Sequence, residues 1–309
     1  MSSSPTPLVL KPAEVAAIQP RNPGDLVVLD ASWHMPNSLR KAREDFRKSH
    51  ILGSYFLDLD EVASSHPLGL KHMMPSPELF AQTCEQFGIR PDSHVVLYDT
   101  HGVFSSPRAL FMFRSFGHER SSILDGGFPA WRAANLPTAG GEPAPLQRSS
   151  YPTAALHPDV VVGYDDIVTN ENKDPDQDTS AFIVLDARSQ GRFLATDPEP
   201  RPGLPSGHIP HSFSLPFQVF LNAPNEVQPY VTLRTPEDMR SSLENVLPRG
   251  HLDAILEGRR KVATSCGSGM TAGILWLGLQ TLGAKAAIYD ESWTGYAMHK
   301  LQEKEQKPQ

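Results

Sequence analysis

The chain has 309 residues, of which 39% are hydrophobic and 20% are charged. This length accommodates two domains with separate cores, and the composition is typical of a folded globular protein. The net charge of −7 argues against a general binder of nucleic acid or of anionic membranes, because both require a basic surface. No apolar run approaches the roughly 18 residues of a membrane span. We therefore expect neither a nucleic-acid partner nor a membrane partner.

The chain contains two cysteines, Cys84 and Cys266. This count argues against a disulfide framework and excludes a zinc site of the Cys-x2-Cys kind, so we expect no metal and no cofactor. Two thiols in a chain of this size fit a reducing compartment. The N-terminal segment lacks the basic stretch followed by an apolar stretch that marks a secretory signal. We predict a cytoplasmic protein, with the mitochondrion as the alternative.

Four sequence blocks occur in the same order in both halves of the chain. The first half contains LVVLDASW (26–33), HILGSYFLDLD (50–60), HVVLYD (94–99) and SILDGGFPAW (122–131). The second half contains FIVLDARS (182–189), GHIPHSFSLPF (207–217), KVATSC (261–266) and AIYDESWTGY (287–296). The blocks align Asp30 with Asp186, His50 with His208, Asp99 with Cys266 and Asp125 with Asp290. This order predicts a duplicated domain.

Short β-branched runs alternate with segments of helical character in each half. This pattern is typical of α/β domains in which helices cover both faces of a mainly parallel sheet. Ser76 followed by Pro77 predicts the start of a helix that Gly88 ends, and Thr235 followed by Pro236 predicts another start. A helix over 104–116 should end at Gly117.

The division between the domains is indicated by a segment rich in Pro, Gly, Ala and Ser that shows no periodicity. We predict an N-terminal domain over residues 1–140, a linker over 141–160 and a C-terminal domain over 161–309.

Cys266 stands where a predicted strand, KVATS, passes through CGSGMTAG into a helical segment. Backbone N–H groups converge in such a turn and bind an anion or a thiolate. Gly267 and Gly269 allow the backbone to curl tightly, and the hydroxyl of Ser268 is a further donor. The local sequence leaves a reactive thiol and a small buried apolar residue equally open. Cys84, inside a predicted helix, is expected to be a core residue.

A cysteine phosphatase would need an arginine six residues after the cysteine, where it grips the phosphate oxygens. The residue at that position is Ala272, and residues 267–271 carry no charge. Phosphatase chemistry is therefore disfavoured.

The loop CGSGMT, the segment DARSQGRF…PEPR…GHIP and the internal repeat together resemble the rhodanese superfamily, and within it the 3-mercaptopyruvate sulfurtransferases. The resemblance covers roughly residues 20–300. It implies an α/β fold of two tandem rhodanese-like domains, each with a mainly parallel sheet flanked by helices. It also implies that the first domain is catalytically silent, since Asp99 takes the place of the cysteine.

The resemblance further implies an active site. The catalytic residues would be Cys266, Ser268, His72 and Asp60, and the substrate would be bound by Arg192, Arg201, Gly267, Gly269, Met270 and Thr271. Guanidinium groups match the planar carboxylate and carbonyl oxygens of an α-keto acid. For Arg188, in contrast, we expect a structural role.

The implied reaction begins when the Cys266 thiolate attacks the sulfur of 3-mercaptopyruvate, which leaves a persulfide on Cys266 and releases pyruvate. His72, oriented by Asp60 and linked through Ser268, would manage the proton. A thiol acceptor (thioredoxin or another dithiol) or cyanide would then remove the sulfur.

Two alternatives stay open. A thiosulfate:cyanide sulfurtransferase would need a basic loop that this sequence lacks, whereas a persulfide relay protein, for example for tRNA thiolation, would have the same active site. The sequence also departs from the family, because Met270 replaces the usual Val, Glu291 stands where Gly is usual, and Gly295 stands where Glu is usual. These departures leave the substrate preference open.

Overall fold

The computed structural model describes residues 5–306, so the beginning of the Ser-rich N-terminal segment and the last three residues lie outside it. The chain forms two compact units. The first unit combines the chain up to Ser64 with Met74–His157 and Leu221–Leu233. The second combines Ser65–Met73, Pro158–Phe220 and the chain from Arg234 onward. Each half of the sequence thus gives one short segment to the unit that the other half builds.

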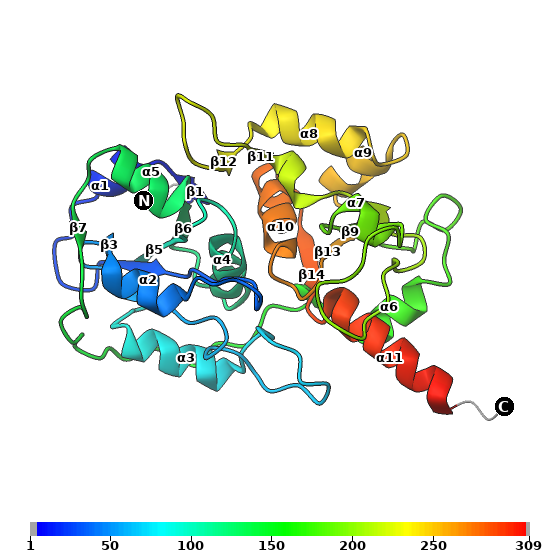
Figure 1. Ribbon diagram of the computed structural model, residues 1–309, viewed down its shortest axis with the longest axis horizontal. Helices are drawn as coiled ribbons and strands as arrows, with labels where there is room; N and C mark the ends of the chain where they lie inside the picture. Colours follow the sequence, from blue (N-terminus) through cyan, green and yellow to red (C-terminus); the bar gives the residue numbers. More distant parts are fainter. Residues whose placement is uncertain (1–4, 307–309) are drawn as a thin grey trace. The chain divides into compact units, whose positions relative to one another are not determined.

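Each unit contains a five-stranded parallel sheet (Figure 1). The strand order in the first unit is β1 (Val9–Leu10), β6 (Ser121–Leu124), β5 (His94–Tyr98), β2 (Leu26–Asp30) and β4 (Tyr55–Phe56). The order in the second unit is β8 (Val161–Val162), β14 (Ala286–Tyr289), β13 (Val262–Ser265), β9 (Ile183–Asp186) and β10 (Phe213–Ser214). The blocks repeated in the sequence occupy equivalent strands, so the predicted duplication is confirmed.

The repeat extends to the packing of single side chains. The His50 ring stacks on Phe46 with centroids 4.0 Å apart, and its Nδ1 lies 2.8 Å from the Phe46 carbonyl oxygen. The His208 ring stacks on Phe193 in the same way, with centroids 4.2 Å apart and 2.9 Å between Nδ1 and the carbonyl oxygen. Each histidine therefore fixes the same junction between a helix and the following strand.

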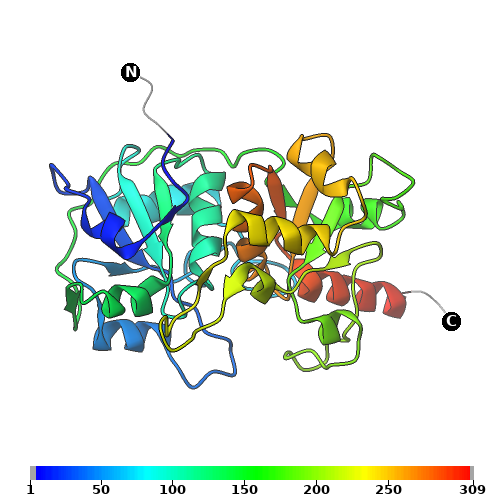
Figure 2. The same cartoon turned by 90° about the horizontal axis from the view of Figure 1, so that it is seen from above.

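Helices cover both faces of the first sheet (Figure 2). On one face, α1 (Pro12–Ala16) and α5 (Gly127–Ala133) share an apolar core with β1, β5 and β6. On the other, α4 (Ser106–Ser115) packs on β5 and β6 and contacts α3 (Pro77–Gln86) through aromatic rings. The remaining elements are α2 (Ala42–Lys48) and the antiparallel pair β3 (His50–Ile51) and β7 (Thr138–Ala139).

The second sheet is covered in the same manner. Helices α6 (Tyr164–Asn170) and α11 (Ser292–Gln306) build a core with β9 and β14 on one face. Helix α10 (Ala272–Thr281) packs on β13 and β14 and contacts α8 (Pro236–Glu244). The other elements of this half of the sequence are α7 (Gln190–Phe193), η1 (Phe217–Phe220), α9 (His251–Leu256) and a hairpin of β11 (Leu221–Asn222) and β12 (Thr232–Leu233). The hairpin belongs to the first unit.

The helix ends follow the predicted signals. The Ser76 hydroxyl accepts a hydrogen bond from the Leu79 N–H at the start of α3, and Thr235 caps α8 in the same way. Gly117 has a φ of +77° just after α4, a left-handed conformation that ends the helix. The predicted helix over 104–116 is therefore confirmed, with a later start at Ser106.

Residues 140–160 contain neither helix nor strand. Within residues 5–306, no helix combines the length and the apolar character that crossing a membrane requires.

Candidate active site

Cys266 directly follows β13, the central strand of the second sheet, at the carboxyl edge where α/β proteins bind their ligands. The residue is buried, with 3% of its surface exposed. Its backbone N–H donates to Ser292 Oγ at 3.2 Å, and its carbonyl oxygen accepts from the Trp293 N–H at 2.9 Å. These bonds fix the cysteine against the beginning of α11.

The loop over residues 266–271 connects β13 to α10. Gly269 has a φ of +81°, which a residue with a side chain would adopt only under strain. The Thr264 hydroxyl donates to the Ala272 carbonyl at 3.0 Å and ties the strand to the helix start. Within residues 5–306, no acceptor takes the backbone N–H groups from Gly267 to Thr271. The loop therefore presents a set of donors next to Cys266.

Arg192 and Arg201 converge on this loop. A β-carbon built on Gly267 would lie 3.1 Å from Arg192 Nη2 and 3.3 Å from Arg201 Nη1. Both guanidinium groups thus lie against the backbone of the residue next to Cys266. A side chain at position 267 would therefore crowd both guanidinium groups.

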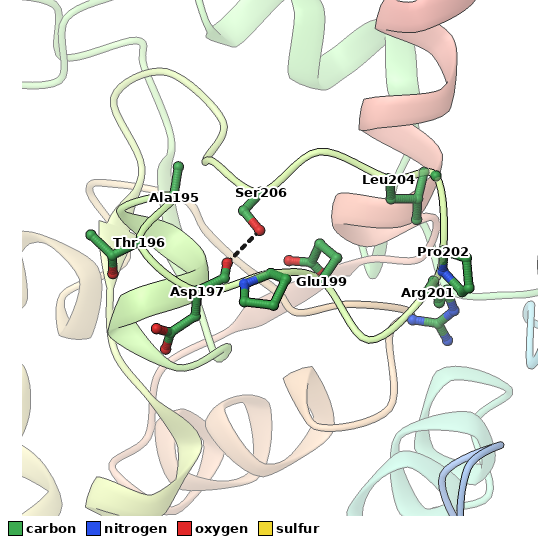
Figure 3. A pocket seen from close by; sticks show the side chains of 10 residues that line it. Ala195, Thr196, Asp197, Glu199, Arg201, Pro202, Leu204 and Ser206 are labelled. Carbon is green, nitrogen blue, oxygen red and sulfur yellow. Dashed lines mark hydrogen bonds between the residues drawn. The ribbon is translucent and has the colours of Figure 1, made fainter.

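Arg201 is carried by an irregular loop. Residues 195–206 surround a hollow of about 610 Å³, and the Ser206 hydroxyl donates to the Asp197 carbonyl at 2.6 Å across it (Figure 3). In Figure 3, Arg201 lies beside Pro202 and Leu204 at the other end of this loop. Prolines on both sides of Glu199 and after Arg201 restrict the backbone that positions the guanidinium.

A buried ion network orients Arg192. Arg188 pairs with Asp186 at 2.6 Å and with Glu199 at 2.7 Å, and Arg192 pairs with the second oxygen of Glu199 at 2.5 Å. The Glu199 side chain is fully buried. The Arg188 guanidinium also lies 4.5 Å from the ring centre of Trp293. These contacts confirm the structural role expected for Arg188.

Glu199 was missed by reasoning from the sequence. The available signal was an acid between two prolines, close in the chain to three arginines. Two cations and two anions make up the network, so the four side chains Asp186, Arg188, Arg192 and Glu199 together carry no net charge.

A cavity of about 440 Å³ lies beside the cysteine loop within the second unit. Its lining includes Ser268, Arg201 and Glu291, together with every residue of the segment Leu68–Met73 except His72. The first half of the sequence contributes this segment. His72 belongs to this segment, is 4% exposed, and has a φ of +53°, unusual for a residue other than glycine. The structure thus brings the segment carrying His72 into the unit that holds Cys266 and Ser268.

Asp60 belongs to the first unit. Its Oδ2 accepts a hydrogen bond from Trp33 Nε1 at 3.2 Å. The role of Asp60 beside His72 stays a prediction.

Cys84 lies inside α3 and is completely buried. Burial raises the pKa of its thiol far above the ordinary value, which makes it a poor nucleophile. The expected core role of Cys84 is therefore confirmed.

The equivalent loop of the first unit contains Asp99 after β5. One carboxylate oxygen, Oδ2, accepts the backbone N–H groups of Phe104, Ser105 and Ser106 at 2.8–3.1 Å and the Ser106 hydroxyl at 2.7 Å. The other oxygen, Oδ1, accepts the His101 N–H at 2.9 Å. A strand–loop–helix junction of this duplicated domain thus surrounds an anion with backbone donors.

Two parallel α/β units of equal topology, with a single cysteine loop after a central strand, define a tandem rhodanese fold. The family described as rhodanese-like domain matches residues 16–134 and 168–299, so the chain belongs to the rhodanese family.

The chain is similar to curated proteins over most of their length. It is 37% identical over 282 residues to the 3-mercaptopyruvate sulfurtransferase of Rattus norvegicus, covering 90% of this chain and 87% of the relative. A probable 3-mercaptopyruvate sulfurtransferase of Schizosaccharomyces pombe is 36% identical over 271 residues, covering 87% and 86% of the two chains. Among solved structures, SseA from Escherichia coli, described with the 3-mercaptopyruvate sulfotransferases, matches with a TM-score of 0.74 and 28% identity over 93% of this chain and 99% of that chain.

Proposed function

We propose that this protein is a 3-mercaptopyruvate sulfurtransferase that carries sulfur as a persulfide on Cys266. The names of its relatives support this reaction. The observation that carries the proposal is the convergence of Arg192 and Arg201 on Gly267, next to the buried Cys266. Two guanidinium groups at this position match the carboxylate and carbonyl oxygens of an α-keto acid whose sulfur faces the thiol.

The charge around the loop favours a monoanion. Arg192 is already balanced within the neutral network with Glu199, Arg188 and Asp186. No carboxylate of residues 5–306 pairs with Arg201, so it adds one net positive charge. Arg201 therefore offers one unpaired charge to the single carboxylate of 3-mercaptopyruvate, and residues 267–271 of the loop contribute none.

The bonds of Asp99 support a persulfide on the equivalent cysteine. In the first unit a carboxylate accepts four backbone N–H groups and one hydroxyl. The outer sulfur of a persulfide on Cys266 is also an anion, and the N–H groups from Gly267 to Thr271 are available to it. We further propose that the first domain is catalytically silent, because a carboxylate cannot accept sulfur in this way.

The reaction proceeds in two steps. The Cys266 thiolate attacks the substrate sulfur, the carbon–sulfur bond breaks, and the electron pair leaves on the enolate of pyruvate, which then takes up a proton. His72, Ser268 and Asp60 are proposed to deliver that proton. Gly267, Gly269, Met270 and Thr271 shape the loop that holds the sulfur.

In the second step a thiol removes the outer sulfur and regenerates the Cys266 thiolate. We propose thioredoxin or another dithiol as the protein acceptor, and the cytoplasm as the compartment, with the mitochondrion as the alternative. Two isolated cysteines, both buried and unbridged among the described residues, support a reducing environment.

Mass spectrometry of the intact protein after treatment with 3-mercaptopyruvate tests the proposal. We expect a gain of about 32 Da, one sulfur atom, located on Cys266. Cys266→Ser should abolish both the gain and the release of pyruvate, whereas the matched control Cys84→Ser should retain both. Sulfur gained equally by the two variants would contradict the assignment of the cysteine.

A further inference from the structure

Glu291 is a carboxylate in the wall of the cavity that also contains Ser268 and Arg201. It follows β14 by two residues and immediately precedes α11. Its side chain is 13% exposed, so it is partly accessible from the cavity.

The ion-pair partners of Glu291 differ from those of three other carboxylates in the second unit. Glu199 and Asp186 are paired with arginines, and Glu171 is paired with Lys300. Among the described residues, Glu291 has only imidazoles as ion-pair partners, at 2.8 Å from His299 Nε2 and 3.9 Å from His66 Nε2. Histidine is not a permanent cation, unlike lysine and arginine. The carboxylate of Glu291 is therefore available to a cation brought by a ligand.

The fold makes room for this side chain at Gly295, one helical turn further along. A β-carbon built on Gly295 would lie 2.4 Å from Glu291 Cβ and 2.6 Å from Glu291 Oε2. Glu291 thus occupies a space that a side chain at 295 would need.

Backbone hydrogen bonds keep Glu291 close to the reactive loop. The Trp293 N–H donates to the Cys266 carbonyl at 2.9 Å, and the Thr294 N–H donates to the Gly267 carbonyl at 3.1 Å. Two residues of chain span at most about 7 Å, so the backbone of Glu291 lies near that of Trp293. Glu291 and Ser268, which lies two residues after Cys266, therefore line one cavity beside the cysteine loop.

We infer that Glu291 is a specificity-determining residue that selects small thiol acceptors carrying a primary ammonium group. This inference rests on the proposed function and concerns its second step. The acceptor thiol loses its proton to solvent, and its thiolate attacks the outer sulfur of the Cys266 persulfide. The sulfur–sulfur bond breaks, Cys266 leaves as a thiolate, and the acceptor carries the persulfide away. The ammonium group pairs with Glu291 during the attack.

The chemistry of the cavity supports a small acceptor of this class. A volume of about 440 Å³ is typical of a site for a small molecule. Arg201 and Lys71 line the same cavity, so a carboxylate on the acceptor is tolerated while Glu291 binds the ammonium.

Acceptor competition on the preloaded enzyme tests the inference. The full chain is loaded with 3-mercaptopyruvate, freed of excess donor, and mixed with 2-aminoethanethiol or with 2-mercaptoethanol, which has a hydroxyl in place of the ammonium. The loss of the persulfide mass is followed over time. The ratio of the two rate constants cancels general effects of a variant on the persulfide.

Glu291→Gln should lower this ratio by about tenfold, because it removes the charge but keeps an oxygen that His299 can donate to. Glu305→Gln, an exposed position on the same helix, should leave the ratio unchanged. In the unmodified enzyme, raising the salt concentration should lower the ratio without any substitution, since salt screens the pairing. This measurement keeps the test valid if Glu291→Gln fails to fold.

A ratio that is the same in Glu291→Gln and in the unmodified enzyme, or that does not respond to salt, would overturn the inference while leaving the proposed function intact. Failure of Cys266 to take up sulfur before any acceptor is added would overturn both. The two failures occur at different steps and are therefore distinguishable.

Discussion

The loops that follow β5 and β13 occupy equivalent positions in the two units, and they differ in the residue at their first position. In the first unit Asp99 fills the loop with its own carboxylate, which accepts five hydrogen bonds from loop and helix donors. In the second unit Cys266 leaves the N–H groups from Gly267 to Thr271 without an acceptor in the described chain. The same backbone arrangement is thus satisfied internally in one unit and open to an anion in the other.

The difference between the two loops concerns stability in the first unit and chemistry in the second. A buried carboxylate that accepts several N–H groups stabilises its loop, whereas unpaired donors around a thiol cost stability and are useful only when an anion forms there. One copy of the loop is thus satisfied by its own carboxylate, whereas the other keeps donors without an acceptor among the described residues. Three substitutions test this comparison.

The largest effect is expected when the carboxylate of Asp99, which fills the loop of the first unit, is removed. Asp99→Ala leaves five donors, three of them in buried hydrogen bonds, without their acceptor, so the free energy of unfolding of the first unit should fall by about 3 kcal/mol. Urea denaturation measures this loss. Sulfur transfer per folded molecule should change less than about twofold, because Cys266 belongs to the other unit.

Asp92→Asn is the matched control, since the side chain of Asp92 is 78% exposed and is paired with Arg90 at the surface. Equal stability of Asp99→Ala and Asp92→Asn would show that the carboxylate does not hold the first loop together.

A smaller effect is expected from removing the guanidinium of Arg201, which forms no ion pair with a carboxylate of the described residues. Arg201→Ala should raise the KM for 3-mercaptopyruvate by about thirtyfold, roughly 2 kcal/mol, because one charged contact to the substrate carboxylate is lost. The KM for thiosulfate should change less. Steady-state kinetics with both donors measures the two effects, and Arg240→Ala, on the exposed face of α8, is the control. An unchanged preference between the donors would contradict the substrate assignment.

The third effect is spread over several pH units and concerns the aspartates that end β2 and β9. Asp186 is paired with Arg188, whereas Asp30 has Ser32 at the equivalent position, and burial raises the pKa of Asp30 to about 7. The folded state therefore binds this proton more tightly than the unfolded chain, in which the pKa is about 4. The free energy of unfolding should fall as the pH rises from about 4 to about 7, by on the order of 1 kcal/mol per pH unit.

Asp30→Asn should remove this contribution, so that its stability declines less than that of the unmodified protein over the same interval. Denaturation curves at pH 5, 6 and 7 provide the measurement. Parallel declines in the two proteins would show that Asp30 does not titrate in this range.

Much of the architecture could be predicted because it depends on local signals. The repeated blocks placed Asp30 and Asp186, and Asp99 and Cys266, at equivalent strand ends, and the caps Ser76 and Thr235 gave the helix starts. The exchange of Ser65–Met73 and Leu221–Leu233 between the units could not be predicted, because these segments lack a repeat and their position depends on packing with distant parts of the chain.

The sequence predicted which residue types form the site, but it did not predict how their charges pair. Cys266, Arg192 and Arg201 were identified from motifs, and the structure places both arginines against Gly267. Glu199 was missed because an acid in a Pro-rich loop is usually exposed, and its burial between two arginines depends on how the loop folds back.

The sequence by itself determined the duplicated fold, the candidate cysteine Cys266 and the loop that contains it, because strand periodicity, caps and glycines act over a few residues. Only the tertiary structure decided which charges remain available. In the folded chain Arg192 is paired with Glu199, and Arg201 has no carboxylate partner among the described residues. Glu291 occupies the space next to Gly295. Electrostatic pairing depends on distance in space and on burial, and neither is encoded by spacing along the chain.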